Sequence, residues 1–155
     1  MKYTLFAVLL LAGLPGIASA VSEPQPPYTP GLGEFMSSIQ MRHAKLWFAG
    51  KGRNWPLAGY ELDELEEGLE DAAKYQPVFK GKPIAEMIGP ATGEPLAQLK
   101  KAIDEKDSAH FVKAYDQLTR ACSSCHQSAG HGFIVIRRPA VPPMSDQRYD
   151  ARNRS

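Results

Sequence analysis

Cysteine is scarce in this sequence of 155 residues: there are only two, and both lie in the pentapeptide Cys122-Ser-Ser-Cys125-His126. The chain therefore has material for one disulfide at most, of the strained type found in thioredoxin-like redox motifs. An excess of charge is also lacking, because 18 basic and 17 acidic residues leave a formal net charge of +1. That balance excludes the strongly basic composition expected of a nucleic-acid-binding protein.

Long apolar runs are absent except near the start, where residues 5–17 read LFAVLLLAGLPGI. A basic Lys2 precedes this run, and the small residues Ala18-Ser-Ala20 follow it, which together predict a secretory signal peptide cleaved after Ala20. The alternative is a membrane anchor, but the run is short for a bilayer span and contains Pro15. We therefore expect an exported, periplasmic protein without a membrane association after cleavage of residues 1–20.

Alternating strand patterns are missing as well, apart from the short run Phe133–Ile136, whereas apolar residues recur at helical spacing in several places. The sequence predicts four helices, at residues 32–49, 56–75, 94–103 and 108–126. Four antiparallel helices in about a hundred residues predict an all-α four-helix bundle, a fold that often holds a cofactor in its core. The expected domain spans residues 32–136.

Turn and capping residues set the expected boundaries. Gly50 is a candidate C-cap of the first helix, and Asn54 and Asp107 are candidates to start the second and fourth. The proline-rich residues 21–31 predict an extended leader, and residues 76–93 a long connection with one helical turn near Ile84–Ile88. Seven acids between positions 61 and 71 predict a solvated face on the second helix, or a docking patch for a basic partner. The basic, proline-rich residues 137–155 predict a disordered tail.

The motif Cys122-Ser-Ser-Cys125-His126 is the attachment sequence of c-type haem. Two thiols three residues apart on a helical turn reach the two vinyl groups at one edge of a porphyrin. The adjacent imidazole of His126 then ligates the iron, for which a neutral imidazole is a suitable ligand. The sequence thus predicts one covalent haem c bonded to Cys122 and Cys125.

Two other chemistries use the same residues. A zinc site would need further ligands, and the remaining histidines are His43, His110 and His131. A redox disulfide between Cys122 and Cys125 would be expected between a strand and a helix, whereas this motif ends a predicted helix. Haem is favoured over both, since c-type maturation takes place outside the cytoplasm, where the predicted signal peptide would direct the chain.

With this motif at the end of its last helix, the chain resembles class II c-type cytochromes, that is, cytochrome c′ and its low-spin relatives, over residues 32–138. The segment Arg42-His43-Ala44-Lys45-Leu46 partly fits a pattern of that family, with histidine where glutamine is usual. The resemblance implies a bundle in which a residue of the first helix faces the open side of the haem. A methionine there implies a low-spin electron carrier, and an apolar residue such as Ile39 or Leu46 implies a five-coordinate iron that binds nitric oxide or carbon monoxide. It also implies a possible homodimer through the first two helices.

The level of the haem along the first helix follows from antiparallel packing. If Gly50 lies level with Asp107, then His126 lies level with the start of the first helix, where Met36 is the nearest buried ligand. His43 is two turns further on, roughly 10 Å at 1.5 Å per residue, and is the weaker candidate. Met41 projects about 140° away from Met36 and is expected to miss the haem.

The remaining expectations concern the surroundings of the haem and the class of function. Tyr115, Leu118 and Phe133 are expected to cover the ring, and Arg42 is a candidate to pair with its propionates. The sequence pattern does not bring a nucleophile and a base, or two carboxylates, close together, so an enzyme is not expected. The sequence therefore predicts a periplasmic mono-haem electron carrier with an unidentified redox partner protein. A gas-binding haem protein is the alternative, followed by a thiol-exchange module.

Overall fold

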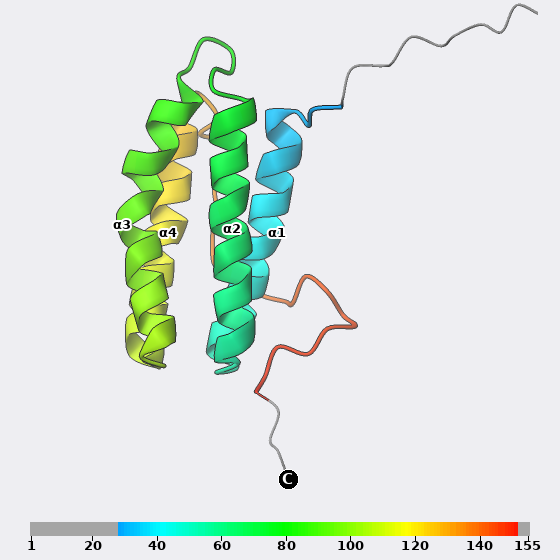
Figure 1. Ribbon diagram of the computed structural model, residues 1–155, viewed down its shortest axis with the longest axis vertical. Coiled ribbons are helices and arrows are strands. Elements are labelled where there is room, and N and C mark those ends of the chain that lie inside the picture. Colours follow the sequence, from blue (N-terminus) through cyan, green and yellow to red (C-terminus); the bar gives the residue numbers. More distant parts are fainter. Residues whose placement is uncertain (1–27, 152–155) are drawn as a thin grey trace, which may run out of the picture.

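The computed structural model of the protein describes residues 28–151, so the predicted signal peptide and most of the leader lie outside the described residues. Within that range the chain is all-helical, without named strands, and its helices run in the order α1 Leu32–Lys51, α2 Trp55–Tyr75, α3 Ile84–Asp104 and α4 Ser108–Ser128. Figure 1 shows them side by side with alternating direction, which confirms the predicted helical bundle.

Two of the predicted helix starts are confirmed by their capping contacts. The Asn54 side chain accepts a hydrogen bond from the Leu57 backbone amide at 3.4 Å, with Pro56 in the first turn of α2. The Asp107 carboxylate accepts from the amides of Ala109 and His110, at 2.9 and 3.0 Å, and starts α4. Both side chains satisfy amide groups that have no partner inside the helix.

The predicted end of α1 at Gly50 is wrong, because the helix continues to Lys51 and is capped by Gly52. Gly50 is buried, and a Cβ atom added to it would lie 2.1 Å from the Phe111 ring of α4. Its small size is therefore required by packing between helices, not by the turn that follows.

The third helix differs more, since it begins at Ile84 and not at the predicted Glu94. Pro90 and Pro95 lie inside it, and each removes one backbone hydrogen bond from the helix. The helix persists because its inner face is apolar over its whole length. That face consists of Ile84, Ile88, Thr92, Leu96 and Leu99, all buried.

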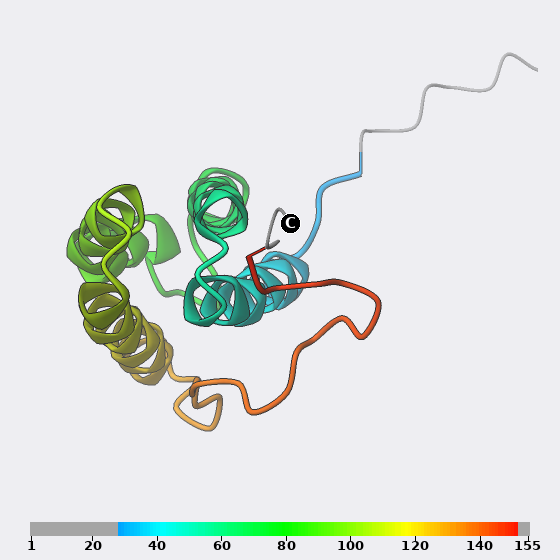
Figure 2. The same ribbon diagram turned by 90° about the horizontal axis from the view of Figure 1, so that it is seen from below.

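The four helices do not pack equally. Adjacent pairs in the sequence pack closely, whereas α1 and α4, the first and last helices, contact each other only sparsely. Figure 2 shows the four helices end-on, with the chain after α4 passing across the side between α4 and α1. The α1–α4 seam is therefore the least closely packed side of the bundle.

The acidic face of α2 is only partly solvated, because its first acid, Glu61, is fully buried. Its carboxylate pairs with Arg42 at 3.2 Å and with Lys45 at 2.5 Å, both from α1. A buried carboxylate requires such partners, since leaving one charge unpaired in the interior costs several kcal/mol.

Residues 131–151, here called the strap, differ from the disordered tail expected after position 136. They contain no helix, yet Tyr149 is buried and packs on Phe48 of α1, with ring centroids 5.7 Å apart. Near its end, the Ala151 amide donates to the Gly52 carbonyl at 3.0 Å. The strap thus runs from the end of α4 to the opposite end of α1 and covers the α1–α4 seam (Figure 1).

Candidate functional site

A largely apolar cavity of about 280 Å³ lies inside the end of the bundle where α1 begins and α4 ends. All four helices, the α2–α3 loop and the strap contribute to its walls. Its apolar lining consists mainly of Leu32, Met36, Ile39, Leu69, Phe79, Ile84, Ile88, Ile134 and Ile136. A concave, apolar site with a few polar groups is typical of cofactor pockets, although this volume is near the lower end of their range.

Cys122, Cys125 and His126 all line this cavity from the last turns of α4. Both cysteines are free thiols and partly exposed. The three residues lie within one helical turn of each other, so the helix presents two sulfur atoms and one imidazole to the same apolar space. That donor set fits a haem held by two thioether bonds and one histidine.

His126 is held in place by the chain that follows it. Its Nδ1 atom lies 3.0 Å from the Ile134 carbonyl oxygen, to which only an N–H can donate. In the neutral form of the ring, the proton therefore sits on Nδ1 and the lone pair on Nε2. Histidines that ligate metals commonly donate their other ring N–H in this way, which fixes the tautomer and the ring orientation.

The strap is attached to α4 beside this histidine through Ser123, one of the two residues between the cysteines. The Ile136 amide donates to the Ser123 hydroxyl at 3.0 Å. The same hydroxyl lies 3.2 Å from the carbonyl oxygens of Ile136 and Thr119. Ser123 thereby fixes the strap segment that carries the Ile134 carbonyl.

Burial raises the pKa of both thiols, that of Cys122 to about 11. A cysteine that attacks disulfides has the opposite property, a pKa lowered by nearby positive charge or by a helix N-terminus. The end of α4 is a helix C-terminus, so the site does not favour thiol exchange.

The register between α1 and α4 places Met36 opposite His126. His43 of α1 contacts Thr119 of α4, with Nε2 and Oγ1 3.0 Å apart. Seven residues, or about two helical turns, back along α1 from His43 is Met36, and seven forward along α4 from Thr119 is His126. Met36 lines the cavity, whereas Met41 is exposed, as its direction on the helix predicts.

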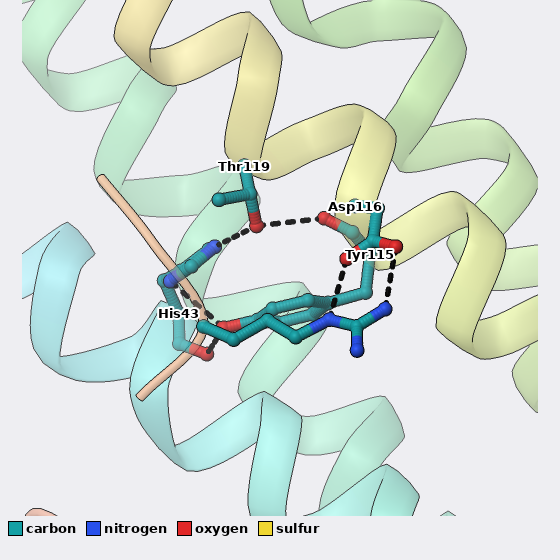
Figure 3. A network of polar contacts seen from close by, with 5 residues as sticks. His43, Tyr115, Asp116 and Thr119 are labelled. Atoms are coloured by element: carbon teal, nitrogen blue, oxygen red, sulfur yellow. Dashed lines mark hydrogen bonds and ion pairs between the residues drawn. The ribbon is translucent and has the colours of Figure 1, made fainter. Parts of the chain in front are cut away.

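His43 also borders the cavity, but both of its ring nitrogens already have partners (Figure 3). The Tyr115 hydroxyl lies 2.9 Å from Nδ1 and 2.9 Å from the His43 carbonyl oxygen. The Thr119 hydroxyl donates to the Tyr115 carbonyl at 2.8 Å, so it accepts from Nε2–H. This leaves the lone pair of the neutral imidazole on Nδ1, and the single Tyr115 O–H is shared between Nδ1 and the His43 carbonyl oxygen.

The environment of His43 keeps it uncharged. Only 4% of its surface is exposed, and this burial lowers the pKa of His43 to about 4. Its interactions account for every polar atom of the ring, so ligation of a metal would first require breaking the bond to Tyr115 or to Thr119. Met36 has no such competing interaction among the described residues.

Four other predicted site residues do not line the cavity, and their roles beside a haem stay predictions. Tyr115 and Leu118 are fully buried in the core next to the cavity and do not line it. Phe133 is 82% exposed, whereas its neighbour Ile134 is 40% exposed and borders the cavity. Arg42 points toward α2, where Glu61 and Glu64 neutralise it at 3.2 and 2.8 Å.

Sequence reasoning missed several residues of the site. Ile84 and Ile88 were expected in a single helical turn within a long connection, yet they belong to α3 and form its part of the cavity wall. Their spacing of four residues indicated the turn, and Pro90 hid its continuation into the helix. Ile134 and Ile136, two residues apart in the short FIVI run, both border the cavity from the strap, as alternate residues of an extended segment point to the same side.

Among residues 28–151, no group of three or more His, Cys, Asp or Glu side chains is placed to hold a metal ion. The zinc alternative thus lacks a ligand set there, whereas a haem iron takes four of its ligands from the porphyrin. None of the helices in residues 28–151 has the length and apolar character to cross a membrane. Comparison with family models, curated proteins and solved structures found no match to this chain.

Proposed function

We propose that the protein is a mono-haem c-type cytochrome that carries electrons, with haem bonded to Cys122 and Cys125 and its iron ligated by His126. The observation that carries this proposal is the convergence of both thiols and the imidazole on one apolar cavity. The haem would supply a one-electron oxidation and reduction at its iron. The chain's own residues hold it, orient it and exclude water from it.

His126 contributes an oriented lone pair. Its Nδ1–H donates to the Ile134 carbonyl, so Nε2 is the atom available to a metal. A hydrogen bond of this kind raises the basicity of the ligating nitrogen. The isoleucine walls from α3 and the strap lower the local dielectric constant, which favours the less charged, reduced form of a haem.

Met36 is the residue we assign to the opposite side of the iron. It lies level with His126 across the α1–α4 seam and lines the same cavity. Because α1 and α4 pack sparsely against each other, this seam is where the bundle accommodates a flat ring most easily. Methionine opposite histidine is a ligand pair of electron-carrying cytochromes and raises the reduction potential.

The first test is a spectrum of the full chain produced with a c-type maturation system. We expect a Soret band, and haem that stays on the polypeptide after denaturation. Cys122→Ser with Cys125→Ser should abolish the covalent attachment, and His126→Ala should change the spectrum. His110→Ala is the matched control, because His110 lies at the other end of α4, where it bonds to Gln98 of α3. A wild-type chain without any Soret band would refute the proposal.

The second test concerns the iron ligand and the gas-binding alternative. Met36→Ala should convert a low-spin spectrum to high-spin and allow carbon monoxide to bind the reduced protein. Met41→Ala, a change at an exposed methionine on the same helix, should leave the spectrum unchanged. A wild-type protein that is already high-spin and binds carbon monoxide would instead support the gas-binding function, with Ile39 over the iron.

Export to the periplasm belongs to the same proposal, because covalent haem attachment of this type occurs there. Sequencing of the mature N-terminus should show a chain that begins at Val21. A mature chain that still begins at Met1 would contradict export by cleavage of residues 1–20.

A further inference from the structure

Two segments far apart in the sequence lie side by side at the cavity end of the bundle. The Phe79 ring in the α2–α3 loop is 5.8 Å from the His131 ring, which in turn is 5.7 Å from Phe133. Phe79 and His131 both line the cavity. The α2–α3 loop and the first residues of the strap thus form its rim, at the top of the bundle in Figure 1.

Three large apolar side chains of this rim point into solvent. Val78 is 61% exposed, Phe133 is 82% exposed and Val135 is 70% exposed. Their neighbours Phe79 and Ile134 line the cavity, so the exposed residues surround its edge. Grouped apolar exposure rimmed by polar residues is characteristic of interaction surfaces.

The same rim carries positive charge only. Lys80 and Lys82 are exposed on the α2–α3 loop, and the Lys80 ammonium lies 5.2 Å from the centre of the Phe79 ring. Residues 72–85 and 117–145, which supply the loop, the end of α4 and most of the strap, contain no Asp or Glu. The chain as a whole is nearly neutral, so this distribution is a marked asymmetry, opposite in sign to the acidic segment of α2.

We propose that this rim patch, formed by Val78, Phe133 and Val135 with Lys80 and Lys82, is the docking surface for an acidic redox partner protein. The inference rests on the proposed function, since it places the partner at the edge of the haem cavity. An apolar centre supplies contact area, and the two lysines steer a negatively charged surface toward it. The acidic face of α2 would repel the same partner and thereby orient it.

The charge part of the proposal is tested with flavodoxin, a small acidic electron carrier, as the probe. Reduction of the haem by flavodoxin hydroquinone is followed by stopped flow at low ionic strength. Lys80→Glu with Lys82→Glu should slow the second-order reduction about tenfold, within the range of electrostatic steering. Lys100→Glu with Lys101→Glu is the matched control, because it changes the charge equally on exposed lysines near the far end of α3, and it should change the rate by less than about twofold.

The apolar part is tested by Phe133→Ser, with Val141→Ser as the control, since Val141 is similarly exposed at 73% but lies further along the strap. Phe133→Ser should weaken flavodoxin binding, measured as the dissociation constant, while Val141→Ser should leave it unchanged. Spectra of all variants must match the wild type, so that a change in the haem is separated from a change in docking.

Amide chemical-shift mapping with oxidised flavodoxin decides the docking site independently of electron transfer. Shifts confined to residues 78–82 and 133–135, and lost in high salt, are the expected result. Shifts on α2, equal effects of the two lysine pairs, or no binding would overturn the docking proposal while leaving haem attachment intact. Binding of the wild type to phosphatidylglycerol vesicles through Phe133, or dimerisation through the patch, would overturn it as well. If the chain carried no haem but the chemical shifts still mapped to the rim, the proposed function would be refuted and the docking surface would not.

Discussion

The two halves of the α1–α4 seam are built in opposite ways from the same pair of helices. In one half, Gly50 admits the Phe111 ring, and His43 bonds to Tyr115 and Thr119. In the other half, Met36 and His126 lie level with each other, with a cavity of about 280 Å³ at that level. The first half has no unused polar atom on its histidine, and the second offers one free imidazole nitrogen and two thiols.

This difference shows how the bundle can keep a cavity at one end while the position of α1 relative to α4 is fixed at the other end. The hydrogen bonds of His43 and the close contact at Gly50 fix α1 relative to α4. The helices can then remain apart at the other end, where they would otherwise collapse on the apolar space between them. A histidine is used in each half, but burial and bonding make one structural and leave the other able to bind a metal.

Acid is expected to have the largest effect of these changes, and it should destabilise the half of the seam that contains His43 and Gly50. His43 is buried as a neutral imidazole, and its pKa in the folded protein is about 4, compared with 6.5 for an ordinary histidine. The unfolded chain therefore takes up a proton below pH 6.5 that the folded protein does not. The stabilisation by neutral His43 is fully present above that pH and is lost progressively toward about pH 4, by up to about 3 kcal/mol.

Urea unfolding followed by tryptophan fluorescence across this window measures the effect. His43→Gln should flatten the dependence of the unfolding free energy on pH, whereas His110→Gln should preserve it. If the slope of His43→Gln equals that of the wild type, another group is responsible for the acid sensitivity.

A methyl group at Gly50 should strain the same half. Its Cβ atom would lie 2.1 Å from the Phe111 ring, so α1 and α4 must move apart. We expect Gly50→Ala to lower the free energy of unfolding by about 1–3 kcal/mol, the usual range for overpacking. Gly59→Ala is the control, with its nearest neighbour 3.9 Å away, and it should be neutral or stabilising by up to about 1 kcal/mol. Equal effects of the two substitutions would show that the contact at Phe111 relaxes freely.

In the half of the seam that contains the cavity, a substitution at Ser123 should have a smaller effect on the free energy of unfolding. Ser123→Ala removes the hydroxyl that accepts from the Ile136 amide, and we expect a loss of about 1 kcal/mol. Because the Ile134 carbonyl that accepts from His126 then becomes less fixed, the reduction potential of the haem that we propose should shift as well. Ser124→Ala is the neighbouring control, since Ser124 is exposed, and Ser123→Thr should restore the wild-type potential. An unchanged reduction potential in Ser123→Ala would show that the strap does not influence His126 through the Ile134 carbonyl.

Much of the fold was predictable because its signals are local. Asn54 and Asp107 cap helices as their side chains suggest, and apolar spacing identified α1, α2 and α4. Antiparallel packing placed His126 level with residue 31 at the start of α1, with Met36 as the nearest candidate, and the contact between His43 and Thr119 moves that level to Met36. These features depend on residues close in sequence or on simple chain geometry.

The features that sequence reasoning missed depend on tertiary contacts. Pro90 and Pro95 are unfavourable in an isolated helix, yet the burial of Ile84, Ile88 and Leu96 outweighs that cost in α3. The bonds that occupy both nitrogens of His43 come from α4, more than 70 residues away. Residues 137–151 of the strap were assigned to a disordered tail on composition, yet Tyr149 is buried and packs on Phe48 of α1.

The strap also determines how the cavity can be entered. All four helices line the cavity, and opening a helix would break a ladder of hydrogen bonds, whereas the strap is an extended segment attached through a few contacts such as that of Ser123. Segments of this kind detach at a lower free-energy cost than the helices they cover. Since the strap also follows Cys122–His126 in the chain, the haem that we propose could be attached to α4 before the strap is in place and enclosed afterwards, without any helix unfolding.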